Sequence, residues 1–314
     1  MKALITGVAG FVGSNLARNL LTDGHQVVGI DMLSDYYDVR IKKANLASLP
    51  PGLDFREADL NTVDLVELLS GVDVVFHQAG QPGVRKSWGA DFGIYMEANV
   101  LATQRLLEAA KDAASLSRFV YASSSSVYGN AERFPTTEDV RPQPISPYGV
   151  TKLAAEHMCS LYAANFGLPT VSLRYFTVYG PGQRPDMAFT RFTRAAVLGE
   201  RITIFGSGEQ IRDFTYVDDV VKANVLAGTT PDVPPGSVFN VAGGSNTSVN
   251  DVLGLLAEMG DRALDVEYID AVAGDVWRTG GSTAAIDRAL GWKAEISLTE
   301  GLSRHLEWAH ATFH

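Results

Sequence analysis

The stretch Thr6-Gly-Val-Ala-Gly-Phe-Val-Gly13 decides the fold, because its glycines have the spacing Gly-x-x-Gly-x-x-Gly. It follows the mostly apolar run Lys2–Thr6 and leads into apolar residues at helical spacing. Bare glycine backbone lets a pyrophosphate approach the N–H groups at a helix N-terminus. Glycines also end strands and pack helices, so the trio alone is weak evidence. In this position it predicts a dinucleotide-binding loop, with contacts from Gly7, Gly10, Phe11, Val12 and Gly13.

Two acidic positions support a dinucleotide. The run Gln26–Asp31 ends in a carboxylate 18 residues after Gly13, where it could accept from both hydroxyls of an adenosine ribose. An acid there repels a 2′-phosphate, which favours NAD over NADP. Asp59 and Leu60 follow the next predicted strand, where they could reach the adenine amino group and pack against its ring. The alternative for Asp59 is a helix N-cap.

Short apolar runs alternate with helical segments through the first half of the chain, which predicts a parallel sheet in a doubly wound, Rossmann-like α/β fold. We assign residues 1–175 to a dinucleotide-binding domain, with a return of the chain near 213–242, and residues 176–314 to a smaller, interleaved C-terminal α/β domain. A long helix is expected over Ala98–Ala114. The predicted strands are Lys2–Thr6, Gln26–Asp31, Leu53–Arg56, Asp73–His77, Arg118–Ser123 and Thr170–Arg174.

Composition narrows the function classes. The 314 residues include a single cysteine, Cys159, so no internal disulfide forms and a reducing cytoplasm suits the protein. With 26 basic and 36 acidic residues, the net charge of −10 disfavours nucleic-acid and anionic-membrane surfaces. No stretch approaches the ~18 apolar residues of a spanning helix. The six histidines lack partners at ligand spacing, so no metal site is expected, and His77 is interpreted as structural.

Tyr148 and Lys152 form a candidate catalytic pair. They lie four residues apart on a helix predicted to begin near Pro147, and therefore on one face. An unperturbed tyrosine has a pKa near ~10, but an adjacent ammonium and a cationic nicotinamide both favour its phenolate. The lysine can also hold the nicotinamide ribose. The hydroxyl run Ser123–Ser126 follows a predicted parallel strand, at the sheet edge where ligands bind.

The glycine run, Asp31, Asp59, Ser124, Tyr148 and Lys152 together resemble the extended short-chain dehydrogenase/reductases that act on nucleotide sugars, in the NAD-dependent epimerase/dehydratase family. The resemblance covers essentially the whole chain. It implies that residues 176–314 bind the nucleotide sugar and that the protein is a homodimer packed through paired helices. It makes Ser124 the catalytic hydroxyl, Tyr148 the acid/base and Lys152 its activator. Further implied cofactor contacts are Gln78, Ala79, Asn99, Ser123 and Tyr175.

The residues after Ser124 separate the reactions of this family. Dehydratases resemble one another in carrying Asp-Glu where Ser125 and Ser126 stand here, and sugar-acid decarboxylases carry Glu at the position of Ser126. Because this chain lacks these carboxylates, a reaction limited to the removal and return of one hydride at C4 fits it better than dehydration or decarboxylation. The segment Leu173–Ala188 is similar to its counterpart in UDP-glucuronate 4-epimerases, with Thr177 where galactose-type epimerases have Asn.

Arg184 discriminates between substrates, because its guanidinium beside serine and threonine hydroxyls can receive a carboxylate. We expect a neutral CH2OH group to leave this guanidinium unpaired. The leading hypothesis is thus reversible 4-epimerisation of UDP-glucuronic to UDP-galacturonic acid. Rivals are a 4-epimerase of UDP-glucose or UDP-N-acetylglucosamine, a UDP-glucuronate decarboxylase and an NAD-sensing protein, and N-acetylated sugar acids stay open. Other implied nucleotide-sugar contacts, each with a surface-charge or packing alternative, are Arg85, Phe189, Arg191, Arg212 and Asp275.

Overall fold

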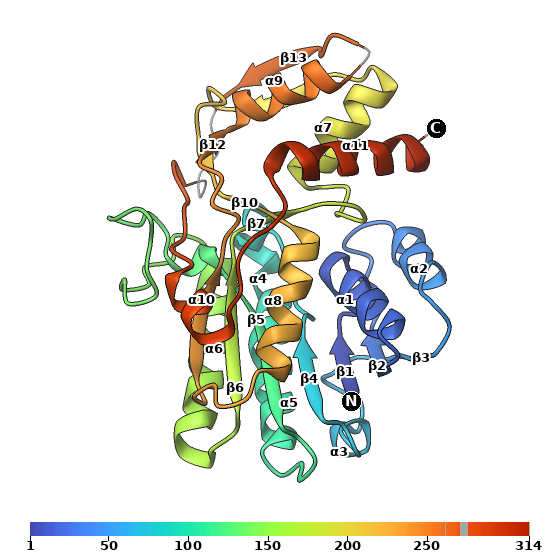
Figure 1. The fold of residues 1–314 in the computed structure, drawn as a ribbon, viewed down its shortest axis with the longest axis vertical. Coiled ribbons are helices and arrows are strands. Elements are labelled where there is room, and N and C mark those ends of the chain that lie inside the picture. The colour runs from blue at the N-terminus through green and yellow to red at the C-terminus, as the bar shows by residue number, and fades with distance from the viewer. Residues whose placement is uncertain (261, 271–275, 314) are drawn as a thin grey trace.

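The computed structural model describes residues 1–260, 262–270 and 276–313. Its centre is a seven-stranded sheet in the order β11-β6-β5-β4-β1-β2-β3, and each neighbouring pair is parallel (Figure 1). The doubly wound, Rossmann-like fold is therefore confirmed. The strands are β1 (Lys2–Thr6), β2 (Gln26–Asp31), β3 (Leu53–Glu57), β4 (Val74–His77), β5 (Arg118–Ser124), β6 (Thr170–Tyr175) and β11 (Ser237–Val241).

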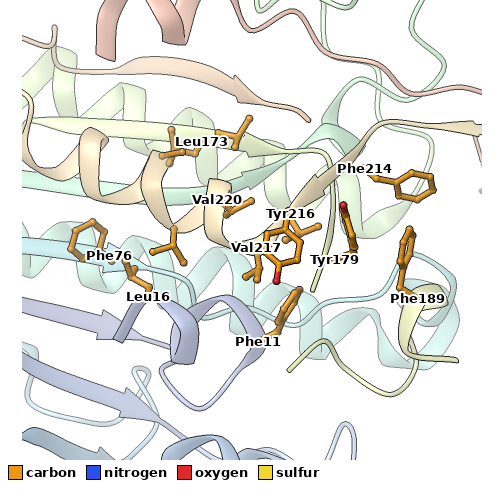
Figure 2. Close-up of a cluster of buried hydrophobic side chains, with 14 of the residues drawn as sticks. Phe11, Leu16, Phe76, Leu173, Tyr179, Phe189, Phe214, Tyr216, Val217 and Val220 are labelled. Carbon is orange, nitrogen blue, oxygen red and sulfur yellow. The ribbon is translucent and has the colours of Figure 1, made fainter. Parts of the chain in front are cut away.

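Helices cover both faces of the sheet, because successive strand residues point to opposite sides. On one side, Phe76 packs in a core with Leu16 of α1 (Phe11–Thr22) and Val220 of α8 (Val217–Thr229), as Figure 2 shows. On the other, Val75 packs in a second core with α5 (Ala102–Ala110) and α6 (Pro147–Phe166). Strand order reverses between β1 and β4, which opens a crevice at the carboxyl ends of the strands.

Local sequence explains where the catalytic helix starts and stops. Ser146 caps α6 by accepting from the Gly149 N–H at 3.1 Å, Pro147 fills its first position, and Gly167 ends it with a φ of 68°. The helix expected over Ala98–Ala114 differs, since a π-helical segment, Met96–Leu101, precedes α5 and α5 ends at Ala110. The pattern of apolar residues does not reveal such a wider turn.

Beyond residue 176 most elements are smaller and lie past the carboxyl ends of the central strands, whereas β11, α8 and α10 (Ala284–Leu290) lie beside the central sheet (Figure 1). β11 and α8 return to the central sheet, so the two regions interleave. Short strand pairs are β7 (Thr177–Tyr179) with β10 (Phe214–Tyr216), β8 (Ile202–Phe205) with β13 (Val266–Ile269), and β9 (Ile211–Arg212) with β12 (Thr247–Ser248). The other helices of this region are α7 (Ala188–Leu198), α9 (Val249–Met259) and α11 (Leu298–Phe313).

Three short helices complete the first region: α2 (Val39–Ala47), α3 (Leu65–Leu68) and α4 (Phe92–Tyr95). Among the helices of the described residues, none combines the length and the apolar character that crossing a bilayer demands.

Candidate active site

A cavity of about 550 Å³ opens at the carboxyl ends of the central strands. It brings together segments that are far apart in the sequence: the glycine loop, the ends of β2, β4 and β5, one face of α6 and the turn after β7. The sequence-predicted residues that line it are Gly7, Gly10, Phe11, Val12, Gly13, Asp31, Asp59, Leu60, Gln78, Ala79, Ser123, Ser124, Ser125, Ser126, Tyr148, Lys152, Tyr175, Thr177 and Arg184.

The glycine loop has no room for side chains. A Cβ on Gly13 would lie 2.2 Å from the Gly7 carbonyl oxygen, and Gly7 has a φ of 70°. Gly10 caps α1 without a side-chain hydrogen bond, so side chains do not occupy the first N–H groups of the helix. Backbone that is bare and close to a helix N-terminus suits a pyrophosphate, and the loop therefore fits a dinucleotide.

Asp31 is held at the end of β2 with 9% of its surface exposed. Its carboxylate accepts from the Ala9 N–H at 3.1 Å and the Leu33 N–H at 2.8 Å. Lys42 of α2, which sequence reasoning missed, places its Nζ 3.9 Å from Asp31 Oδ1 and also lines the cavity. Burial lowers the pKa of Lys42 against the attraction of Asp31. A carboxylate beside an ammonium can accept from and donate to the two hydroxyls of a ribose.

The Asp59 side chain accepts from the Asn61 N–H at 2.8 Å and so closes a turn. Helix α3 starts later, at Leu65, and its N-cap is Asp64. The alternative interpretation of Asp59 as a helix N-cap is therefore wrong. Leu60 is 6% exposed beside it and lines the cavity, which leaves an apolar wall there.

The catalytic candidates lie on two elements. Ser124 ends β5, and its side chain is hydrogen-bonded to Tyr148 of α6. Burial raises the pKa of Tyr148, while the Ser124 hydrogen bond and the nearby charge of Arg184 lower it. Lys152 lies one turn further along α6, and burial lowers its pKa to about 8. This arrangement can move a proton to or from a hydroxyl placed beside Tyr148 and Ser124.

Behind the serine run lies a buried ionic network. Ser123 donates to Glu156 Oε2 at 2.6 Å, and Arg174 donates to both oxygens of Glu156 at 2.9 and 2.6 Å. Arg174 also donates to the Tyr128 hydroxyl at 2.6 Å. The network joins β5, α6 and β6 through Ser123, the residue before Ser124. Ser123, for which the sequence predicts a cofactor contact, lines the cavity, and its hydroxyl also ties the strand end to α6.

Thr177 and Arg184 line the cavity near the catalytic trio. Arg184 is already paired, because its Nε donates to Asp186 Oδ1 at 3.0 Å and its Nη2 to Oδ2 at 2.9 Å. Our expectation that a neutral sugar would leave this guanidinium unpaired is therefore wrong. Burial lowers the pKa of Arg184, but its hydrogen bonds to Asp186 and the charge of that group outweigh burial and raise it.

Several sequence candidates lie elsewhere. Asn99 is 1% exposed and holds the loop after β4, accepting from the Gln81 N–H and donating to its carbonyl. Phe189 is 1% exposed in the aromatic core of Figure 2. Arg191 is exposed on α7. Asp275 lies outside the described residues.

Two further basic candidates, Arg85 and Arg212, make contacts within the protein. The Arg85 guanidinium lies 4.2 Å from the Phe205 ring centroid. Arg212 Nη1 donates to the carbonyls of Ile211 and Trp277, at 2.9 and 3.2 Å. The Arg85 contact joins a loop of the first region to β8 of the second, whereas the contacts of Arg212 lie within the second region.

No group of three or more His, Cys, Asp or Glu side chains within the described residues is arranged to hold a metal ion. The buried His77 ring instead contacts the hydroxyls of Thr6 at 2.7 Å and Thr103 at 2.9 Å.

The family model for the NAD dependent epimerase/dehydratase family matches residues 3–242. The chain belongs to this family. The resemblance inferred from the sequence is thus confirmed. A Bacillus subtilis (strain 168) protein named as an uncharacterized UDP-glucose epimerase, YtcB, is 41% identical over 316 residues, covering 100% of this chain and 99% of that protein.

Solved structures of family members have the same fold. The UDP-glucuronic acid 4-epimerase from Bacillus cereus, in complex with UDP-glucuronic acid and NAD, superposes with a TM-score of 0.95 at 40% identity over 99% of both chains. MoeE5 in complex with UDP-glucose and NAD superposes with a TM-score of 0.91 at 42% identity over 100% of both chains. MoeE5 has also been solved with UDP-glucuronic acid and NAD.

Proposed function

We propose that this protein is an NAD-dependent 4-epimerase that reversibly converts UDP-glucuronic acid to UDP-galacturonic acid. The observation that carries the proposal is one cavity that holds Ser124, Tyr148 and Lys152 together with Thr177 and Arg184. The first three can oxidise and reduce a hydroxyl carbon with a nicotinamide. The last two, with the hydroxyls of the serine run, can receive a carboxylate on the same sugar.

Tyr148 takes the proton from the C4 hydroxyl, and its hydrogen bond with Ser124, which lowers the pKa of Tyr148, favours the phenolate that accepts this proton. NAD, when bound, supplies a reversible hydride acceptor for C4. Lys152, buried one turn away, favours the phenolate of Tyr148 and holds the nicotinamide ribose. The resulting 4-keto sugar turns over and is reduced on its other face, and Tyr148 then returns the proton.

The active site must also prevent decarboxylation of the intermediate, because a 4-keto sugar acid is a β-keto acid that readily loses CO2. Loss is fastest when the C5–carboxylate bond is perpendicular to the ring carbonyl. Ser125, Ser126, Thr177 and Arg184 line the cavity. In this proposal they hold the carboxylate away from that alignment. No acidic side chain stands at 125 or 126 to assist dehydration.

Cofactor binding follows from the cavity. The pyrophosphate would lie against Gly7, Gly10 and Gly13 at the start of α1, and the adenosine ribose would lie between Asp31 and Lys42. We assign residues 1–175, with the return near 213–242, to the NAD-binding domain and residues 176–314 to the nucleotide-sugar domain. Arg85 and Arg212 remain our candidates for the diphosphate, and Arg191 and Asp275 for the rest of the nucleotide. The burial of Phe189 in the core leaves its side chain no surface to offer the uridine.

We also propose a cytoplasmic homodimer. Large apolar side chains are exposed on α4, on the π-helical segment and on α6, which pack against one another, and such a patch fits a second copy of the chain. These side chains are Phe92, Ile94, Met96, Leu101, Val150 and Leu161. A Leu161→Glu substitution should convert the dimer to a monomer in light scattering, and a monomeric parent protein would contradict the assignment.

The second candidate is a 4-epimerase of neutral UDP-sugars. The ion pair of Arg184 with Asp186 favours it, because a CH2OH group at this position would not leave the guanidinium without a partner. The test is to incubate protein purified without added cofactor with UDP-glucuronic acid, and separately with UDP-glucose, and to resolve products by NMR. UDP-galacturonic acid from the acid supports the proposal. UDP-galactose with no acid turnover supports the second candidate, and a UDP-pentose would instead indicate a decarboxylase.

A further inference from the structure

Arg184 and Asp186 form an ion pair at the wall of the substrate cavity. The side chains are 18% and 38% exposed, and they meet through two parallel hydrogen bonds at 3.0 and 2.9 Å. Two other Asp–Arg pairs of the chain with the same separation in sequence, Asp38–Arg40 and Asp54–Arg56, lie more in solvent, with Arg40 and Arg56 at 89% and 56% exposed. The pair at the cavity is therefore the more strongly coupled one.

The turn that carries the pair is fixed by the core. Gln183, 2% exposed, donates to the Val178 carbonyl at 2.9 Å and accepts from the Thr190 N–H at 2.9 Å. The Met187 N–H donates to the Arg184 carbonyl at 3.1 Å, which closes the turn over the pair. Arg184 and Asp186 are thus held at a set separation by β7 and α7.

The guanidinium has two edges that can each bind a carboxylate, and Asp186 occupies the Nε–Nη2 edge. The Nη1 side stays available to a ligand in the cavity that Arg184 lines. With Asp186 ionised, the pair has no net charge, so a sugar carboxylate adds a second anion to one cation. A neutral sugar meets a guanidinium that is already paired.

We propose that Asp186 is a built-in counter-ion of Arg184 that reduces the preference of the cavity for sugar acids and so admits neutral UDP-sugars. Asp186 acts through Arg184 and does not itself contact the sugar. The inference rests on the proposed function, because it takes the C5 substituent of the sugar to lie at Arg184.

The test compares the wild type with Asp186→Asn. The amide keeps the shape and a hydrogen-bond acceptor but removes the charge, so Arg184 becomes a net cation. We expect kcat/KM for UDP-glucuronic acid, divided by that for UDP-glucose, to rise roughly tenfold, which is the size of one charge–charge interaction at a partly exposed site. The change should lie in a lower KM for the acid, with kcat little altered. Asp54→Asn removes the matched surface carboxylate and should leave the ratio unchanged.

A lower or unchanged ratio in Asp186→Asn would overturn the inference, since Asp186 would then orient Arg184 or have no influence on the substrate. An equal loss for both substrates would do the same. Calorimetric dissociation constants of both UDP-sugars separate this result from the proposed function. A shift of their ratio without any turnover would support the counter-ion and refute the epimerase, whereas turnover of the acid with no shift would do the reverse.

Discussion

Replacing Arg184 by methionine removes the guanidinium and keeps much of the apolar stem. Arg184 is 18% exposed, and its Nη1 side can donate two charge-assisted hydrogen bonds to the sugar carboxylate. Such bonds contribute about 1.5–3 kcal/mol each, and partial exposure puts their combined loss at ~3–4 kcal/mol. The expected fall in kcat/KM for UDP-glucuronic acid is therefore roughly 10²–10³-fold. For UDP-glucose, which offers no carboxylate, we expect a fall of less than about fivefold.

The assay is NMR or anion-exchange chromatography of the products from UDP-glucuronic acid, with UDP-glucose run in parallel. Because the carboxylate of the 4-keto intermediate is no longer held, a UDP-pentose should appear with the variant and not with the wild type. Arg194→Met is the matched control, since Arg194 is an exposed α7 residue paired with Glu200. Equal losses for both substrates, or full acid turnover without pentose, would refute this reasoning.

Three further predictions concern the buried groups. Lys152→Met should abolish turnover yet raise stability at pH 7 by about 3 kcal/mol, because the folded pKa of about 8 lies below the usual 10.5. Between these two pKa values the unfolded chain binds one more proton than the folded protein, so wild-type stability should rise from pH 8 to 10.5. The difference in free energy of denaturant unfolding between Lys152→Met and the wild type should therefore shrink over this range. A difference that stays constant with pH would contradict this. Glu156→Gln should destabilise the folded protein by about 3 kcal/mol or more, because it leaves the buried charge of Arg174 without its partner. Urea unfolding measures this loss, with Glu258→Gln as the control. Gly13→Ala should lose bound NAD, because its Cβ would lie 2.2 Å from the Gly7 oxygen, and retained cofactor absorbance would contradict the glycine-loop account.

The parallel sheet could be predicted from sequence because each strand is an apolar run bounded by turn residues. β3, β5 and β6 each extend one residue beyond the predicted Leu53–Arg56, Arg118–Ser123 and Thr170–Arg174, and Asp31 ends β2 at the cavity as expected. Such features depend on local periodicity and on the rule that parallel strands present their carboxyl ends together.

The features that could not be predicted depend on side-chain contacts that no sequence pattern reveals. Lys42 reaches Asp31 from a separate helix, and no spacing rule joins them. Asp186 lies two residues after Arg184 in the sequence, but only the turn closed by the Met187 N–H and the Arg184 carbonyl brings the two side chains together. Phe189 directly follows the segment Leu173–Ala188, which made it a candidate, whereas the structure packs it against Tyr179 and Phe214.

The most direct test of the central claim uses UDP-glucuronic acid deuterated at C4. We expect UDP-galacturonic acid that retains deuterium at C4, formed without added NAD, because one hydride leaves and returns within the same active site. The proposed 4-epimerisation would be contradicted by loss of the deuterium to solvent, by a UDP-pentose as the main product, or by no conversion of the acid at all.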